Sequence, residues 1–309
     1  MKTARYGILV FSMTVTVLAN SMAYSQAGNA GAAGLAFLKL GVGARASALG
    51  EAYTSMSGDA TATYWNPAGL AALSTSQLTF THTEWLQDIS NDFLAVAFPG
   101  FGGTVGVSLY ANRVDGIERR VIPTAEPIGT IDANDIAASL SYGRYWGDQF
   151  SAGVTVKYLY EKIYIESAAG YAFDFGVGLQ PFEGPLHLGV VVQNLGSMDD
   201  LLDQAVQLPT TVRAGASYQI EFAALDGALV VAADGIKVRD QDAHVNVGAE
   251  LVLKHHLAFR FGYQSGFEEK AFGGGFGLNF QQRYHLDYGY APFSSNLGDT
   301  HRFSLSVDL

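Results

Sequence analysis

The chain of 309 residues contains no cysteine at all. Without thiols, a disulfide framework and a thiolate metal site are both excluded. Charged residues are scarce as well, at 15% of the chain, whereas average proteins carry roughly 25%. The charge that is present is mainly acidic, with a formal net charge of −11. This balance argues against nucleic acid as a partner.

Long hydrophobic runs are also missing. Beyond the extreme N-terminus the sequence has no stretch of the roughly 18 apolar residues that a membrane-spanning helix needs. Yet 49% of the residues are hydrophobic and 36 are glycine. In lipid, only helices and closed barrels satisfy their own backbone hydrogen bonds. A membrane location therefore requires a β-barrel.

The sequence does contain a two-residue alternation of apolar and polar side chains from about Gln77 to Leu309. It is clearest at the C-terminus, where apolar side chains occupy the odd positions 303–309 and polar ones the even positions 302–308. Successive side chains of a strand point to opposite faces. One face of each such segment is therefore apolar and the other polar, as in a barrel with lipid outside and polar groups inside.

About fourteen such segments can be counted, so residues 77–309 are predicted to form an all-β, antiparallel transmembrane barrel. An even number of strands is the rule for bacterial single-chain barrels and places both chain ends in the periplasm. Short and long links roughly alternate, as periplasmic turns and external loops do. The approximate strands are residues 77–85, 92–99, 103–112, 132–146, 149–164, 171–181, 186–195, 209–220, 228–237, 243–253, 256–264, 270–280, 283–291 and 300–309.

Residues 1–27 have the features of a cleaved signal peptide. Lys2 and Arg5 supply the positive start, a short apolar core follows at residues 8–19, and small residues come after it. The alternative is an uncleaved anchor helix. Export through such a signal predicts a bacterial outer-membrane protein in contact with membrane lipid.

Residues 28–76 break the alternation and are rich in alanine and glycine. They are too few for an independent domain, so they are predicted to form a hatch, or plug, with short helices such as residues 46–56. Asn66, Pro67 and Gly69 are expected to form a turn that seats this plug. Arg45 and Asp59 are its charges expected to pair with the barrel wall.

Inward-facing charges of both signs lie along the predicted strands. We interpret them as a self-neutralising network that holds the plug, the alternative being a polar path that opens when the plug moves. These lumen charges are Asp174, Arg213, Glu250, Arg260, Asp287 and Arg302.

Two predicted external loops are candidates for docking a partner, the alternative being solvated rim loops. Residues 113–131 mix basic with apolar side chains, and the second loop is acidic with two adjacent leucines. The residues concerned are Arg119, Arg120, Ile122, Asp199, Asp200, Leu201 and Leu202.

Nothing in the sequence indicates a catalytic, cofactor or metal site. His255 and His256 are adjacent, so on a strand they point apart and do not chelate together. The glycine clusters at residues 41–43 and 273–277 do not lie between a strand and a helix, as a nucleotide-binding loop does. A G-x-S-x-G elbow is not present. The chain is therefore predicted not to be an enzyme and to need no cofactor.

The sequences of residues 43–53 and 58–70 resemble the N-terminal signature of the PorV/PorQ family, within the wider FadL-like outer-membrane barrels. Residues 191–196, 208–215 and 287–302 are similar to the same family. The resemblance implies a fourteen-stranded barrel with an N-terminal hatch and no catalysis. PorV-like proteins serve type IX secretion: they receive the C-terminal domain of secreted cargo and pass it to a surface attachment complex. FadL-like proteins move hydrophobic molecules.

Two functions follow from this resemblance. The first is a secretion component that binds cargo or surface-assembly partners through its external loops. The second is a transporter of a hydrophobic ligand across the outer membrane. The similarity of residues 191–196, 208–215 and 287–302, which lie beyond the plug, favours the first function.

Overall fold

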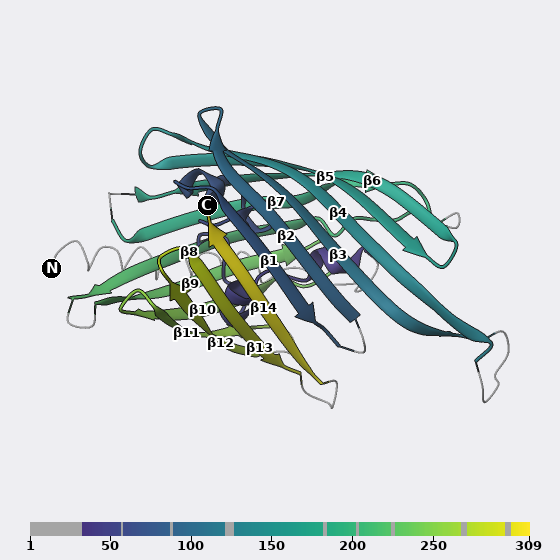
Figure 1. Cartoon of the computed structure of the whole chain (residues 1–309). Coiled ribbons are helices and arrows are strands. Elements are labelled where there is room, and N and C mark those ends of the chain that lie inside the picture. Colours follow the sequence, from purple (N-terminus) through teal and green to yellow (C-terminus); the bar gives the residue numbers. More distant parts are fainter. Residues whose placement is uncertain are drawn as a thin grey trace.

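The computed structural model describes residues 33–56, 58–86, 89–120, 127–181, 184–201, 204–223, 226–266, 271–293 and 298–309. Its strands form one closed barrel in which each strand is antiparallel to its neighbours in the chain (Figure 1). The last strand closes the barrel against the first, with Gln77 opposite Asp308 and Glu84 opposite His301. The predicted fold of about fourteen antiparallel strands is confirmed.

The strands follow one another around the barrel in sequence order. They are β1 (Gln77–Glu84), β2 (Ile89–Gly100), β3 (Gly103–Arg119), β4 (Gly129–Trp146), β5 (Phe150–Ile163), β6 (Glu166–Leu179), β7 (Leu186–Met198), β8 (Thr211–Phe222), β9 (Gly227–Val238), β10 (His244–Leu253), β11 (Leu257–Gln264), β12 (Phe272–Phe280), β13 (Tyr284–Pro292) and β14 (Asp299–Asp308).

The alternation in the sequence corresponds to the two faces of the barrel wall. In β14, Phe303 is 51% exposed on the outside, whereas its neighbour Arg302 is 1% exposed on the inside. Outward apolar side chains meet lipid at no desolvation cost, and inward polar ones find partners in the lumen. Among the described helices, none has the length and apolar character needed to cross a membrane.

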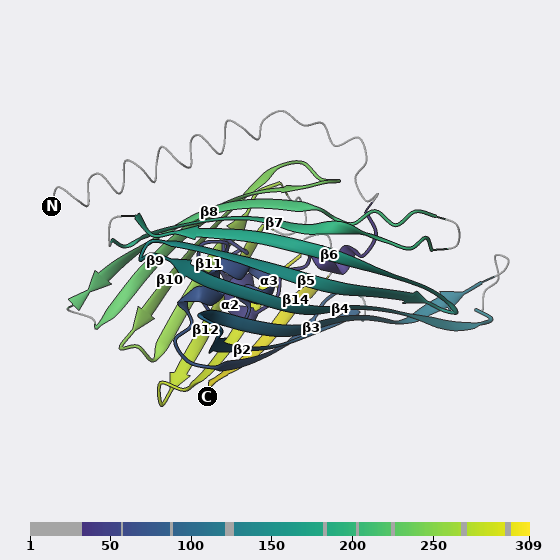
Figure 2. The same ribbon diagram turned by 90° about the horizontal axis from the view of Figure 1, so that it is seen from above.

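The plug lies inside the barrel (Figure 2) and consists of short helical turns. These are η1 (Ala36–Lys39), α2 (Ala44–Ala48), α3 (Ala62–Trp65) and η2 (Pro67–Ala72), where η marks a 3-10 helix. The expected helix over residues 46–56 is thus shorter than predicted, because Gly50 and Glu51 take left-handed conformations with φ of 62° each. Leu49, Trp65 and Leu70 are fully buried.

Glycines in the wall let the plug approach the strands closely. At nine positions on nine strands, an added Cβ would lie less than 3.0 Å from a plug atom, closer than real Cβ atoms come. At most of them the plug atom is backbone, which cannot swing aside. The wall and the plug are therefore fitted to each other through these missing side chains, which belong to Gly106, Gly143, Gly153, Gly176, Gly189, Gly248, Gly262, Gly275 and Gly289.

The two ends of the barrel differ in their connections. The end where β1 begins and β14 ends carries short links such as residues 101–102, 147–149 and 281–283. The opposite end carries the longer ones, such as residues 120–128 and 199–210. Outer-membrane barrels have short periplasmic turns and longer external loops. The chain ends of the barrel therefore face the periplasm, and the second end faces outward.

The predicted loop at residues 113–131 is largely strand. β3 continues to Arg119 and β4 begins at Gly129, so the two form a ribbon that projects beyond the neighbouring strands (Figure 1). The pairing shifts between Val114 and Ile117, where Gly116 has φ of 72°. Such a bulge inserts an extra residue and changes the phase of the alternation. The period-2 pattern breaks there, which is why the sequence suggested a loop.

Candidate functional site

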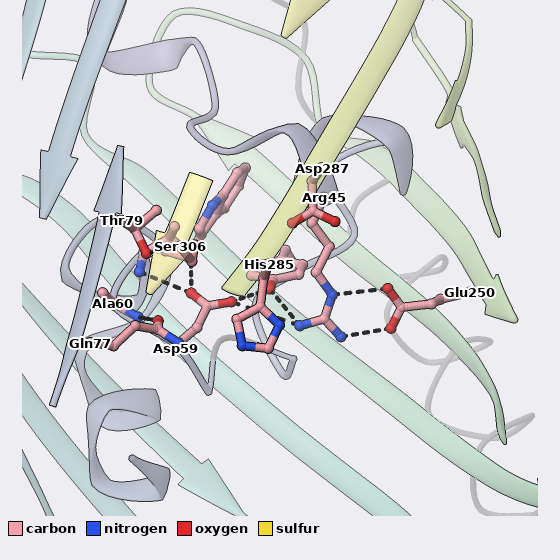
Figure 3. Close-up of polar contacts among 12 residues, drawn as sticks. Arg45, Asp59, Ala60, Gln77, Thr79, Glu250, His285, Asp287 and Ser306 are labelled. Carbon is pink, nitrogen blue, oxygen red and sulfur yellow. Dashed lines mark hydrogen bonds and ion pairs between the residues drawn. The ribbon is translucent and has the colours of Figure 1, made fainter. Parts of the chain in front are cut away.

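The plug is held to the wall by a chain of alternating charges, of which Figure 3 shows the pair of Arg45 and Glu250. Arg45 on α2 donates from Nη2 and Nε to the two carboxylate oxygens of Glu250, at 2.6 and 2.9 Å. Glu250 also accepts from Arg260 Nε at 2.5 Å, and Arg260 Nη1 donates to Asp287 at 2.7 Å. Three of the predicted lumen charges, on β10, β11 and β13, are thus linked to the plug charge Arg45. Glu250 bonds Arg45 directly, and Arg260 connects Glu250 to Asp287. Bidentate pairing fixes orientation as well as distance.

Asp59 bonds to plug residues. It accepts from the Tyr53 hydroxyl at 2.5 Å and from the Thr61 N–H at 2.9 Å, and lies 3.7 Å from Arg45 Nη1. Asp59 lies just before α3, and its carboxylate accepts the hydrogen bond from a backbone N–H at the start of that helix. Asp59 therefore does not pair with the wall as expected; it orients Arg45, which does.

A further anchor that the sequence did not reveal is Asp234 on β9. One of its carboxylate oxygens accepts from the N–H of Tyr53 at 3.0 Å, the N–H of Thr54 at 2.9 Å and the Thr54 hydroxyl at 2.6 Å. Small or apolar residues flank Asp234 on both faces of β9. The alternation is weak there, so no sequence pattern indicates that the Asp234 side chain points inward.

Two more predicted lumen charges contact the plug. Arg302 donates to the Gly41 carbonyl at 2.7 Å and lies 3.8 Å from the Glu51 carboxylate. Arg213 places its guanidinium 5.0 Å from the centre of the Trp65 ring and donates to Gln193 at 3.2 Å. A guanidinium over an indole face is a favourable cation–π contact. The two wall arginines therefore bind the plug in different ways. Arg302 bonds a backbone carbonyl of the plug, and Arg213 contacts Trp65, its largest fully buried side chain.

Asp174, the remaining lumen charge, supports the wall itself. It pairs with Lys157 at 2.7 Å and accepts from the Asn194 N–H at 2.8 Å. Asn194 has φ of 59° at the point where the β6–β7 pairing shifts. The buried ion pair therefore stabilises an irregular turn of β7 that leads to the external loop.

The predicted turn at Asn66, Pro67 and Gly69 forms the start of η2. The Asn66 side chain accepts from the Ala68 N–H at 3.1 Å and donates to the carbonyls of Thr54 and Val177 at 3.0 and 3.3 Å. Pro67 stands at the first position of η2, and the Gly69 N–H donates to the Asn66 carbonyl at 2.9 Å. One side chain thus caps a helix and ties the plug to β6.

We expect Asn66→Ala to lower the yield of folded barrel and the free energy of unfolding by about 1–2 kcal/mol, the range for a lost helix cap. Simultaneous replacement of Pro67 and Gly69 should have an effect in the same direction. Heat-modifiable migration on a gel measures the folded fraction. Thr75→Ala, at an exposed position between the plug and β1, is the matched control. Unchanged migration of the Asn66 variant would contradict a seating role for this turn.

The outer end of the plug is tied to external loops. Lys39 Nζ lies 3.1 Å from Asp240 in the β9–β10 loop, and the Gly34 N–H donates to the Gln207 carbonyl at 3.0 Å. Burial alone would raise the pKa of Asp240, but the hydrogen bond and charge of Lys39 hold it below its usual value. The carboxylate therefore stays charged and keeps this tie at neutral pH.

Between this tie and the wall, apolar side chains fill the outer half of the lumen. The ring of Tyr110 on β3 packs against Phe37, Tyr64 and Phe93, with centroids 5.1, 5.9 and 6.0 Å apart. Phe37 on η1 is 2% exposed. In this conformation the space that a ligand entering from outside would need is occupied by η1.

A cavity of about 210 Å³ lies at the periplasmic end, beneath the plug. Its lining mixes polar side chains, such as Arg45, Gln180 and His187, with apolar ones, such as Leu188 and Val230. In the described part of the chain, no group of His, Asp or Glu side chains could hold a metal ion.

Of the residues predicted for docking, the five that the structure describes lie on the external rim. On the ribbon, Arg119 stacks over the Tyr164 ring at 5.3 Å and Arg120 pairs with Glu118 at 2.8 Å. In the acidic loop, Asp199 and Asp200 are exposed and Leu201 is half-buried. The two groups belong to separate loops. Ile122 and Leu202 lie outside the described residues.

Two comparisons, with known families and with curated proteins, concern the sequence of the chain. A family model described as "Type IX secretion system protein PorV" matches residues 23–232, more than half of the chain. No curated protein matches the sequence.

Solved structures with a similar fold include two toluene transporters and a FadL homologue, all at low sequence identity. The chain is similar to the Pseudomonas putida toluene transporter TodX, with a TM-score of 0.64 and 10% identity over 87% of this chain and 99% of that one. The Ralstonia pickettii toluene transporter TbuX gives 0.62 and 11%, over 87% and 98%. A Pseudomonas aeruginosa FadL homologue gives 0.52 and 12%, over 86% and 98%. At these identities the likeness shows a shared barrel fold.

Proposed function

The chain belongs to the PorV family of type IX secretion system proteins, and from this we propose that it is an outer-membrane secretion component that binds secreted cargo at its external rim. Residues 1–27 would be removed during export, residues 28–76 would act as one plug, and residues 77–309 would be the barrel. In this proposal the protein has no catalytic role.

The observation that carries the proposal is the projecting β3–β4 ribbon above a filled lumen. The ribbon rises beyond the ends of β2 and β5, so part of its backbone has no neighbouring strand in the barrel. Ile117 and Ile128 on the ribbon and Ile165 in the β5–β6 turn expose 37%, 59% and 71% of their surface. Exposed apolar side chains beside arginines are typical of protein-binding surfaces.

A crosslinking experiment tests this proposal. We expect a photo-reactive amino acid at position 130, an exposed site on the ribbon, to capture secreted proteins that share a C-terminal domain. Ile117→Ser with Ile128→Ser should reduce that capture at least about tenfold, because each truncated apolar contact costs roughly 1 kcal/mol or more. Phe101→Ser, which alters an 89% exposed side chain at a periplasmic turn, is the control. Equal capture by the ribbon variant and the control would overturn the proposal.

A second function, transport of a hydrophobic small molecule, is supported by the aromatic cluster in the outer half of the lumen. Departure of η1 would leave Phe93, Tyr110 and Tyr64 around an apolar space. This candidate predicts that purified protein retains an apolar ligand. It also predicts that cells lacking the protein take up some apolar compound slowly. Normal uptake across a panel of such compounds would exclude it.

A further inference from the structure

A row of polar side chains crosses the lipid-facing side of β3, β4 and β5 near their external ends. Arg113 lies directly opposite Asn134, and Asn134 lies directly opposite Lys162. Ser90 on β2 and Ser167 on β6 extend the row at either side. We propose that this row binds the phosphate of an anionic lipid in the outer leaflet of the membrane. The inference is independent of any cargo-binding role.

The strand alternation places both cations on the outer face. Arg113 follows the buried, inward Asn112, and Lys162 follows the buried, inward Glu161. Further toward the periplasm, the same face of these strands is apolar. Leu109, Leu140 and Tyr158 expose 44%, 57% and 43% of their surface there. The row therefore lies at the upper border of the belt that meets lipid chains.

The two cations have no protein partner in the part of the chain that the structure describes: neither Arg113 nor Lys162 has a side-chain hydrogen bond or ion pair. Two of the carboxylates that could compete with a ligand for these cations accept hydrogen bonds from other groups. Asp92 accepts from His82 at 2.7 Å, and Asp132 accepts from the Gly116 N–H at 3.2 Å in the bulge. The side chains of Arg113 and Lys162 are thus available to a ligand, with the exposed carboxylate of Asp115 two residues from Arg113 on β3.

The spacing suits one phosphate group. Strands lie about 4.8 Å apart, so Arg113 and Lys162, two strands apart, have backbones roughly 10 Å apart. Both side chains are long enough to converge over Asn134, whose amide adds donors. A small hollow of about 90 Å³ lies beside Arg113 and Asn134. It is lined also by the carboxylates of Asp92 and Asp135, so the phosphate would lie outside it, over Asn134. Guanidinium groups bind phosphate oxygens bidentately, and ammonium groups supply a point charge.

The position favours a lipid phosphate over a free one. Long basic side chains at the edge of an apolar belt extend toward the polar layer of the membrane. Lipids of the bacterial outer leaflet carry phosphates at that depth, with acyl chains below them. A bound lipid would therefore place its phosphate on the row and its chains against Leu109, Leu140 and Tyr158.

Native mass spectrometry of the purified full-length barrel tests the proposal, with bisphosphorylated lipid A and its dephosphorylated form as probes. We expect Arg113→Gln with Lys162→Gln to weaken binding of the bisphosphorylated lipid about 30-fold, at roughly 1 kcal/mol per cation. Binding of the dephosphorylated lipid should not change. Arg113→Lys should retain most of the affinity. Lys254→Gln with Arg283→Gln removes the same charge at the periplasmic end and should match the wild type.

Heat-modifiable migration of each variant establishes that it is folded before binding is compared. Equal affinity of the wild type and the Arg113/Lys162 variant for the bisphosphorylated lipid would overturn the proposal. An equal loss for the dephosphorylated lipid would also overturn it, because the loss would then come from contacts other than the phosphate. Competition by millimolar inorganic phosphate would show a free-anion site and overturn the assignment to lipid.

Discussion

Glu250→Gln is expected to destabilise the seated plug by about 3 kcal/mol, the lower part of the range for breaking a buried ion pair. The Glu250 side chain is 3% exposed and bonds both Arg45 and Arg260. The substitution removes the negative charge and leaves two guanidinium groups without their shared partner. Because Arg45 is 32% exposed, water compensates part of that cost, which is why the lower part of the range applies.

Release of the plug can be followed through Trp65, whose ring is fully buried in the closed barrel. With Trp85 and Trp146 replaced by Phe, the urea concentration at which Trp65 becomes accessible to acrylamide reports plug release. We expect a lower midpoint for Glu250→Gln. Glu118→Gln breaks the exposed pair with Arg120 and should change stability by at most about 1 kcal/mol.

A double-mutant cycle separates the pair from its surroundings. Arg45→Gln in the Glu250→Gln background should cost less than Arg45→Gln alone, with a coupling energy of about 0.5–3 kcal/mol. Additive effects of the two changes would mean that Arg45 and Glu250 do not hold the plug together. The measured coupling therefore tests the central contact of the plug–wall network.

Gly262→Val is expected to prevent the plug from seating. A Cβ at this position of β11 would lie within 3.0 Å of the backbone nitrogen of Gly50 and the backbone carbon of Leu49. Overpacking of a core costs roughly 1–3 kcal/mol when side chains adjust. The strand backbone determines where this Cβ lies, and the plug atoms it would meet are backbone atoms. The clash is therefore relieved only if the plug itself moves. We expect a loss of about 3 kcal/mol or more.

Two measurements distinguish a displaced plug from a collapsed barrel. Heat-modifiable migration should show that some Gly262→Val barrel still forms. Conductance in planar bilayers should rise in that fraction, because the lumen is no longer filled. Gly129→Val, where an added Cβ meets nothing within 4 Å, is the control and should match the wild type. Wild-type stability and conductance of Gly262→Val would show that the plug seats without this close approach.

The sequence determined the barrel because its alternation has the period of a strand and recurs often enough to close a sheet. Phe303 and Arg302 illustrate this, since each side chain faces the side that its polarity predicts. The lumen charges Arg260 and Glu250 were predicted for the same reason. The extent of the β3–β4 ribbon was not, because the bulge at Gly116 shifts the phase of the pattern.

The partners of those charges were decided only by the tertiary structure. Arg45 meets Glu250, and Asp234 holds Thr54, across about two hundred residues of chain. Strand register and barrel closure bring such groups together, and no local pattern encodes a distance in space. The same holds for Arg113, Asn134 and Lys162, which are polar residues in separate segments of the sequence. They become one row only because three neighbouring strands pair in that register.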